Sequence, residues 1–410
     1  MRRILFVDDE PRVLDGLRRM LWGMRHEWEM AFAPGGTEAL EMMQSRHFDV
    51  VVTDMRMPGM DGYRFLSAIQ EQYPQVVRII LSGHSDREML LKSTGLAHQF
   101  LTKPCDAETL KATIARACGM RHLLEDESLI DVVSRIESLP SLPSLYAEVM
   151  DEVNSPEGSL NRVGEIIAKD VGMSAKLLQL VNSSFFGMPV HVSNPVRAVN
   201  LLGFEIIRAL VLSVKIFSQF SRAALPGYSI ENLWGHSMAT ANLAKVIARK
   251  LEIGQSAVDE AFLAGLLHDC GKLILFDRMP EKFQAIVQAA HAEGCGFLES
   301  ELKTLGTTHA QVGGYLMGIW GFPESLVEAI AFHHSPAKCR HTDFGPLAAV
   351  HLADIFEHEM SGAGTKDKIS EIDIAYMREI KCADRIESLR TACREFVRQG
   401  EGYARENTVR

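Results

Sequence analysis

The chain has 410 residues, of which 47% are hydrophobic and 23% are charged, and its formal net charge at pH 7 is −10. This length predicts two or three domains, and the acidic balance argues against nucleic acid as a partner bound through its phosphates. No apolar run approaches the roughly 20 residues of a membrane span. No signal peptide is visible after Met1, and the seven cysteines include no CxxC pair. We therefore expect reduced thiols, no membrane contact and a cytoplasmic location.

Residues 1–122 alternate short apolar runs with segments of helical periodicity. The runs are Ile4–Val7, Glu29–Ala33, Val50–Thr53, Val77–Leu81 and Gln99–Thr102. Strands that alternate with helices predict a parallel sheet covered on both faces. We expect this first domain to be an α/β doubly wound, five-stranded parallel sheet of the flavodoxin-like type.

Polar residues stand where these runs end. Asp8 and Asp9 follow the first run, Asp54 the third, Ser82 the fourth and Lys103 the fifth. The carboxyl ends of parallel strands meet at one edge of a sheet, so these side chains should lie together. Three neighbouring carboxylates need a cation, and hard oxygen ligands suit Mg²⁺. A hydroxyl and an ammonium beside that metal predict a site for a phosphoryl group.

The stretch that begins at Asp54 and reads Asp-Met-Arg-Met-Pro-Gly-Met-Asp-Gly is specific in this register. Together with the other strand ends, it resembles the receiver domain of two-component response regulators. The resemblance implies that Asp54 accepts a phosphoryl group from a sensor histidine kinase in a phosphorelay. The alternative is a receiver that keeps the fold and is never phosphorylated.

The same resemblance implies roles for the neighbouring residues. Asp9 and Asp54 would bind Mg²⁺ directly, with the backbone carbonyl of Arg56 as a third ligand, and Asp8 would bind it through water. The side chains implied to act on the phosphoryl group and on the switch are Ser82 and Lys103, which would bind its oxygens, and Phe100, which would be the switch aromatic residue.

Residues 123–138 are expected to form a helical linker. A last receiver helix is predicted over Ala107–Ala117, and its apolar periodicity continues through this segment, which favours a helix that runs on into the next domain. A solvated linker helix and a helix that forms a homodimer are equally compatible with this pattern.

From residue 139 to 360 the strand-like alternation disappears, and we expect an all-α output domain. The spacing predicts helices over Ser159–Asp170, Leu233–Leu251, Val258–Phe276, Glu281–Glu293, His309–Trp320, Glu324–His333 and Leu347–His358. The stretch Phe204–Phe220 is almost wholly apolar and is expected to be interior. Asn194 followed by Pro195 is a typical helix start. Residues 361–410 are expected to be a C-terminal helical extension, too short for a DNA-binding output domain.

Histidines and aspartates recur through this helical domain. His236, His268, Asp269 and Asp354 together form a candidate ligand set for a second divalent metal. Such a metal lowers the pKa of bound water and supports phosphoester hydrolysis. Four further residues are candidates for the second shell or for substrate contacts: Lys272, His309, His333 and His334. The alternative is that all of these are hydrogen-bonded structural side chains, and this is what we expect of His351 and His358.

Several separated motifs in this region agree in order with one family. They are Leu178–Ser183, Trp234–Ser237, Gly265–Leu273 and Trp320–Pro323, and they resemble the HDOD domain, a relative of the HD metal-dependent phosphohydrolases. HDOD domains as a group lack established hydrolase activity. The cyclic-di-GMP hydrolases of the HD-GYP type carry a Gly-Tyr-Pro signature, whereas Ser335 and Pro336 follow the histidine pair here.

Two functions therefore stand side by side. In the first, the receiver controls an HDOD domain that acts through an unknown downstream protein or small-molecule ligand. In the second, the receiver gates a metal-dependent HD-type phosphohydrolase that acts on nucleotides or cyclic nucleotides.

Overall fold

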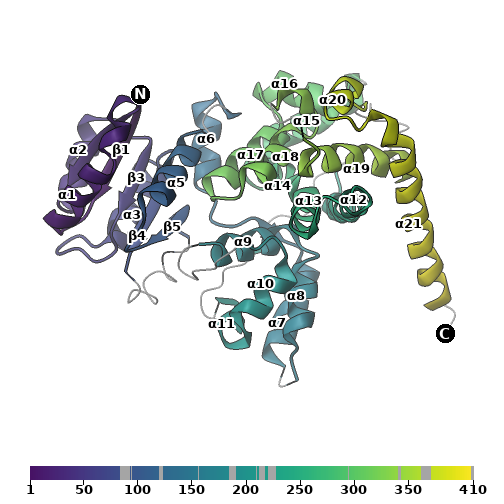
Figure 1. Ribbon diagram of the computed structural model, residues 1–410, viewed down its shortest axis with the longest axis horizontal. Helices are drawn as coiled ribbons and strands as arrows, with labels where there is room; N and C mark the ends of the chain where they lie inside the picture. Colours follow the sequence, from purple (N-terminus) through teal and green to yellow (C-terminus); the bar gives the residue numbers. More distant parts are fainter. Residues whose placement is uncertain are drawn as a thin grey trace. The chain divides into compact units, whose positions relative to one another are not determined.

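A computed structural model describes residues 1–83, 93, 95–119, 123–155, 157–183, 191–208, 210–211, 218–219, 228–293, 295–339, 343–361 and 371–407. The chain divides into two compact units, whose helices and strands are labelled in Figure 1. The first unit comprises Met1–Ala168, Gly172–Gln219 and Tyr315–Phe322, and the second comprises Lys169–Val171, Phe220–Gly314 and Pro323–Arg410. Within the described part of the chain, no helix combines the length and apolarity that a membrane span requires.

The first unit begins with the parallel sheet that the sequence predicts. Its strands are β1 (Arg2–Val7), β2 (Trp28–Ala33), β3 (Val50–Thr53), β4 (Val77–Ser82) and β5 (Gln99–Thr102). They pair in the order β2-β1-β3-β4-β5, and every pairing is parallel. Because the register aligns Val7 with Thr53 and Ser82 with Thr102, the strands end at a common edge. The predicted α/β fold class is confirmed.

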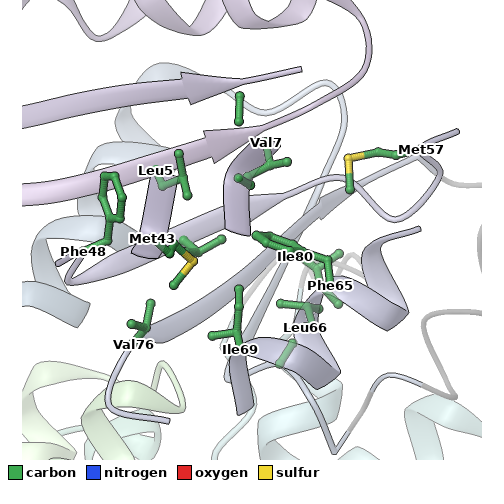
Figure 2. Packing of buried hydrophobic residues seen from close by; sticks show 14 of the residues in the cluster. Leu5, Val7, Met43, Phe48, Met57, Phe65, Leu66, Ile69, Val76 and Ile80 are labelled. Atoms are coloured by element: carbon green, nitrogen blue, oxygen red, sulfur yellow. The ribbon is translucent and has the colours of Figure 1, made fainter. Parts of the chain in front are cut away.

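Helices α1 (Pro11–Met20), α2 (Gly36–Ser45), α3 (Gly62–Gln72) and α5 (Ala107–Gly119) accompany this sheet, with a 3₁₀ turn at Trp22–His26. Figure 2 shows how α2 and α3 cover one face: Met43 and Leu66 pack against Leu5, Val7 and Ile80 of the strands. Side chains alternate between the faces of a strand, so the equally buried Ile4 and Phe6 belong to the other face, and α5 packs against β3. Both faces of the sheet are therefore buried.

The linker is helical only in part. Helix α5 ends at Gly119, residues 124–126 are non-helical, and α6 spans Glu127–Ser134. The Asp126 side chain accepts hydrogen bonds from the backbone N–H groups of Ser128 and Leu129, which caps a new helix. The expectation of one helix running on from the receiver is thus wrong, since a capping residue starts a separate helix.

The remaining helices of the first unit are α7 (Pro143–Asn154), α8 (Leu160–Ile167), α9 (Val171–Val181), α10 (Pro195–Leu202) and α11 (Phe204–Arg208). Asn194 caps α10 as predicted, by accepting a hydrogen bond from the Arg197 backbone N–H. In the apolar stretch Phe204–Phe220, helix α11 covers Phe204–Arg208, and Ile207, Leu210 and Val211 are buried, as expected of an interior segment. Residues 218–219 form a short strand, β7, which pairs in parallel with β6 (Pro140–Ser141). Residues 209, 212–217 and 220 lie outside the described residues.

The second unit is helical. Its elements are α12 (Ile230–Lys250), α13 (Gln255–Leu267), α14 (Cys270–Arg278), α15 (Pro280–Glu293), α16 (Phe297–Leu305), the start of α17 (His309–Ile319), α18 (Glu324–Phe332), α19 (Pro346–Ser361), α20 (Ile374–Glu379) and α21 (Ile386–Asn407), with 3₁₀ turns at Pro336–Lys338 and Ala383–Arg385. Helices α12, α13 and α19 pack on one another, and α18 packs on α13 and α19. The polar break expected at Ser361–Lys368 lies outside the described residues from 362 onward.

One predicted helix of this unit is interrupted at a point that matters for the site. The sequence suggests a continuous helix over Val258–Phe276, but α13 ends at Leu267 and α14 begins at Cys270. Asp269 lies at the junction with φ −96° and ψ 9°, outside the helical range. The break turns the His268 and Asp269 side chains toward the neighbouring helices.

Candidate functional site

The first candidate site lies at the carboxyl edge of the sheet. Asp8, Asp9 and Asp54 each offer a carboxylate oxygen, and these atoms all lie within 4.8 Å of one another. Lys103 joins them: its Nζ lies 2.6 Å from Asp8 Oδ2 and 3.2 Å from Asp54 Oδ1. Asp8 and Asp54 are buried. One ammonium cannot neutralise three carboxylates, so the cluster has the charge and the donor atoms that a hard divalent cation needs.

Burial and charge act against each other in this cluster. Burial raises the pKa of Asp54, the Lys103 ammonium opposes that shift, and the charge of Asp8 adds to it. Burial on its own lowers the pKa of Lys103, but its hydrogen bond to Asp8 and the charge of Asp54 outweigh burial and raise it. Lys103 therefore stays charged. A second cation beside Asp54 would favour the ionised form of its carboxylate.

The other predicted receiver residues surround this edge. Ser82 is buried at the end of β4, and its carbonyl accepts a hydrogen bond from the Lys103 backbone N–H at 2.8 Å. Phe100 is buried in β5 and belongs to the hydrophobic core cluster beside the sheet. Arg56 is exposed in the loop after β3, two residues beyond Asp54. The roles assigned to these three residues stay predictions.

Gly62 explains part of the sequence motif around Asp54. It begins α3, and its backbone N–H donates to the Met55 carbonyl at 3.0 Å. A Cβ atom at this position would overlap the Asp54 carbonyl oxygen and the Met55 Cα. Glycine therefore permits the close approach of α3 to the residue that carries the candidate phosphoacceptor.

The second candidate site lies within the second unit, where side chains from several helices converge. One group of ligand atoms comes from His236 of α12, His268 at the helix junction and Asp354 of α19. His236 Nε2 lies 3.1 Å from His268 Nε2 and 3.2 Å from Asp354 Oδ1. All three side chains were predicted as ligands, and the fold brings them together.

A second group adjoins the first and consists of Asp269, His309, His333 and His334. Asp269 connects the two groups, because its Oδ1 lies 2.9 Å from His309 Nε2 and its Oδ2 lies 3.5 Å from His268 Nε2. His334 Nε2 lies 3.2 Å from His309 Nε2. The histidines predicted for the second shell thus stand in the same cluster as the predicted ligands.

Hydrogen bonds from the outer ring nitrogen to a backbone carbonyl orient two of these imidazoles. The Nδ1 atoms of His268 and His333 lie 2.7 Å from the Gly265 carbonyl and 2.8 Å from the Ile330 carbonyl. Since a carbonyl oxygen only accepts, each Nδ1 carries the proton, and each Nε2 keeps a lone pair directed inward. The buried Nε2 of His333 has no hydrogen-bond partner in the structure described. A buried lone pair without a donor is what a metal ligand leaves when the ion is absent.

The pKa values separate the histidines into two kinds. Burial lowers the pKa of His268 to about 4 and holds the pKa values of His333 and His334 well below the usual range, so these rings are neutral. Burial also acts on His236, but its hydrogen bonds to Asp354 and Glu357 outweigh burial and raise its pKa to about 10. For His309, the charges of Glu301 and Asp269 outweigh burial and raise the pKa.

The aspartates remain charged in spite of burial. Burial raises the pKa of each, but Lys272 beside Asp269 and His236 beside Asp354 hold both pKa values well below the usual range. Lys272 Nζ lies 2.7 Å from Asp269 Oδ2. The direct partner of Lys272 is thus Asp269. Its predicted contact with a substrate phosphate stays a prediction.

The cluster has an open side and a closed side. The side chains of His268, Asp269 and His309 are each only 1% exposed, whereas His236 is 13% and His358 is 34% exposed. The exposed members of the cluster are thus His236 and His358 on α12 and α19, together with His334 after α18, whose side chain is 15% exposed.

Gly271 lets α14 approach α17 closely. A Cβ atom at residue 271 would overlap the carbonyl oxygen of His309. Because His309 is the first residue of α17, this approach brings its ring next to Asp269. The close packing of α14 and α17 thus explains why residue 271, two positions after Asp269, is a glycine.

The sequence analysis missed three residues beside this cluster. Glu301 of α16 and Glu357 of α19 accept hydrogen bonds from His309 and His236. His358, expected to be an ordinary histidine, has its ring centroid 4.6 Å from that of His236. Helical spacing places Glu357 and His358 near Asp354 and gave a signal, whereas Glu301 lies on a helix that the sequence analysis did not predict. His351 binds the His333 carbonyl and the Asp373 N–H, in line with its expected structural role.

Two parts of the chain match known protein families. Residues 4–115 match the response regulator receiver domain, and residues 139–336 match the HDOD domain. The chain belongs to the receiver–HDOD response regulators. An uncharacterized protein of Treponema pallidum (strain Nichols) is 27% identical to this response regulator over 209 residues, which are 50% of this chain and 39% of the relative.

Two named relatives are transcriptional regulatory proteins. HoxA, a hydrogenase transcriptional regulatory protein of Cupriavidus necator, is 27% identical over 57% of this chain and 48% of its own length. ZraR, a transcriptional regulatory protein of Escherichia coli (strain K12), is 31% identical over 36% of this chain and 34% of its own. The response regulator spans about half or less of the length of these relatives.

Two solved structures were also matched. The MmoQ response regulator of Methylococcus capsulatus str. Bath is 20% identical, with a TM-score of 0.48 over 62% of this chain and 97% of that chain. An HDOD domain protein of Geobacter sulfurreducens is 20% identical, with a TM-score of 0.38 over 69% of this chain and 98% of that chain.

Proposed function

We propose that this response regulator acts in a phosphorelay in which Asp54 accepts a phosphoryl group from a sensor histidine kinase. The observation that carries the proposal is the contact of Lys103 with both Asp8 and Asp54, beside three carboxylates that gather at one edge of the sheet. An Asp54 oxygen attacks the phosphorus of a phosphohistidine, the P–N bond breaks, and an acyl phosphate forms.

The neighbouring side chains support this chemistry. Asp9 and Asp54, with Asp8 nearby, would hold Mg²⁺, which supplies positive charge to the transferring phosphoryl group. The Lys103 ammonium adds a second positive charge next to Asp54. Ser82, which is joined to Lys103 through a backbone hydrogen bond, is the candidate donor to a phosphoryl oxygen.

A phosphoryl group changes the output only if its contacts differ between two states. A buried network within the first unit offers a connection. The Ser134 carbonyl at the end of α6 accepts hydrogen bonds from Arg78 Nη2 at 3.0 Å and His98 Nε2 at 2.9 Å. Arg78 lies on the strand that ends at Ser82, so a shift of that strand reaches the linker. We propose that the HDOD domain then acts through a downstream protein or ligand.

The test is phosphorylation of the full chain by acetyl phosphate in the presence of Mg²⁺, followed by intact-mass measurement and peptide mapping. We expect one phosphoryl group at Asp54 and none in Asp54→Asn. Asp61→Asn is the matched control, because Asp61 is a half-buried cap in the same loop and asparagine caps about as well. Equal labelling of Asp54→Asn would refute the phosphoacceptor.

A second candidate function rests on the cluster in the HDOD domain. We propose that His236, His268, Asp269, His309, His333, His334 and Asp354 bind divalent metal, and that the receiver gates phosphoester hydrolysis of nucleotides or cyclic nucleotides there. The inward lone pairs and the two charged aspartates support metal binding. A bound metal would supply an activated water as nucleophile. The side chains would hold that metal, and a substrate would approach at its more exposed members, His236 and His334.

Elemental analysis tests the metal first, because hydrolysis depends on it. Protein purified and then saturated with Mn²⁺ or Fe²⁺ should retain metal, and the double variant His268→Ala/Asp269→Ala should not. His291→Ala, an exposed histidine of α15, is the control. Wild-type protein without bound metal at saturation would refute this second candidate and leave the first untouched.

A further inference from the structure

Two carboxylates outside the predicted ligand set stand behind the candidate metal cluster. Glu301 is fully buried on α16, and its Oε2 accepts from His309 Nδ1 at 2.8 Å and from the His309 backbone N–H at 3.1 Å. One oxygen thus holds both donors of the same residue. It fixes the start of α17 and the rotation of the ring together, with His309 Nε2 facing Asp269.

Glu357 makes the corresponding contact at the open side. Its Oε2 lies 2.6 Å from His236 Nδ1 and 3.0 Å from His358 Nδ1. His236 therefore donates its outer N–H to a carboxylate, and its Nε2 faces His268 and Asp354. Glu357 lies one helical turn from Asp354 on α19. This one helix therefore supplies a candidate metal ligand, Asp354, and the carboxylate that orients His236.

His236 and His309 differ in this from the other oriented histidines. His268 and His333 donate to carbonyls three residues earlier, and any residue at those positions would supply the carbonyl. His236 and His309 depend on an acidic side chain that another helix supplies. Each of these two rings lies between an outer glutamate and an inner aspartate.

We propose that Glu301 and Glu357 are positioning residues that set the tautomers of His309 and His236 and strengthen both imidazoles as ligands of a divalent metal. The proposal rests on the metal binding proposed above. A carboxylate behind a ligand imidazole fixes its ring orientation and raises its basicity, and loss of such a partner costs about 10–100-fold in metal affinity. Glutamine keeps the size of the side chain and removes its charge.

The experiment compares Glu301→Gln and Glu357→Gln with matched controls on the same helices. On α16, Glu299→Gln removes an exposed ion pair with Lys303. On α19, Glu359→Gln removes an ion pair with Arg390 of α21. The probe is Zn²⁺, and its Kd for the HDOD cluster of the full chain is measured by competition with a chelator. We expect a Kd about 10–100-fold higher for each test variant and an unchanged Kd for each control.

A second readout separates positioning from general damage. Histidine ¹⁵N spectra of Zn²⁺-loaded wild type should show protonated Nδ1 atoms for His236 and His309. Glu301→Gln should change the signal of His309, and Glu357→Gln should change the signals of His236 and His358, which are the histidines that each glutamate binds. If Glu301→Gln lowers the melting temperature of the metal-free protein, the metal-induced rise in melting temperature of that same variant replaces the Kd, and it should still be smaller than in wild type.

The outcomes separate this inference from the proposed function. Wild type that binds Zn²⁺ while both test variants bind it equally tightly, with unchanged histidine signals, would overturn the positioning role alone. Wild type that binds no Zn²⁺ would overturn the metal site itself.

Discussion

The receiver and the HDOD domain of this protein gather acids in different ways. In the receiver, three carboxylates and one lysine come from residues that end three strands of one sheet. In the HDOD domain, the ligand atoms come from several helices, and imidazole nitrogens outnumber carboxylates. Hard oxygen donors favour Mg²⁺, and imidazoles favour transition metals such as Zn²⁺, Mn²⁺ or Fe²⁺. The difference teaches that one chain carries two clusters of different donor chemistry, and the two proposed metal sites are expected to prefer different metals.

The largest expected effect breaks the HDOD side of this comparison. Asp269 touches both ligand groups, so Asp269→Asn should weaken transition-metal binding more than the about 100-fold that loss of an outer partner costs. Chelator competition measures this Kd. Asp277→Asn, which alters an acid near the end of α14 that pairs with Arg278, should leave this Kd unchanged. Mg²⁺-dependent phosphorylation of Asp54 should persist in both variants, and its loss in Asp269→Asn would contradict two independent sites.

The next effect concerns the stability of the receiver. Arg78 is 1% exposed, and its guanidinium donates to the carbonyls of Leu96, Pro74 and Ser134. Arg78→Met leaves these buried acceptors without their donor, and we expect the free energy of unfolding to fall by about 3 kcal/mol. Urea denaturation measures it. Arg64→Met on the exposed side of α3 is the control, and an equal loss there would contradict a special role for the buried arginine.

A matched pair of glycine variants sharpens the comparison further. Gly62→Ala forces α3 away from Asp54, and Gly271→Ala forces α14 away from His309. We expect each to cost about 1–3 kcal/mol by overpacking. Gly62→Ala should slow phosphorylation without changing transition-metal affinity, and Gly271→Ala should do the reverse. Gly16→Ala, on a helix with open space around it, is the control. Crossed effects would mean that the two sites do not respond separately.

The smallest effect is a pH dependence of the metal-free protein. Burial lowers the pKa of His236, but its hydrogen bonds to Asp354 and Glu357 outweigh burial and raise this pKa to about 10. A histidine whose pKa is higher in the folded state stabilises the fold, and this contribution is complete below its pKa in the unfolded chain, about 6.5. The contribution is lost as the pH rises through the pKa of the folded state. The stability difference between wild type and His236→Gln, measured with chelator present, should therefore shrink from pH 7 to pH 10. A difference that grows over this range would contradict the paired imidazolium.

The sequence predicted the receiver more completely than the HDOD domain, and the reason is geometric. Strand ends of a parallel sheet share one edge, so the order of Asp8, Asp54 and Lys103 along the chain was enough to place them together. In the helical domain, residue types and their order indicated the ligand set. Spacing could not show that Asp269 joins two groups, since that depends on a helix break.

The partners of the histidines were hidden for the same reason. Glu301 comes from a helix that the sequence analysis did not predict, and its contact with His309 depends on how α16 meets α17. His309, His333 and His334 were placed in the second shell, although they offer ligand atoms of their own. Packing between helices, which sequence periodicity does not encode, decides these positions.

The most direct test of the central claim is the Mg²⁺ dependence of phosphoryl incorporation from acetyl phosphate into the full chain. We predict that one phosphoryl group appears on Asp54 with Mg²⁺ present, that chelation of the metal prevents it, and that Asp9→Asn reduces it strongly. Labelling that ignores Mg²⁺ or occurs on a residue other than Asp54 would contradict the claim.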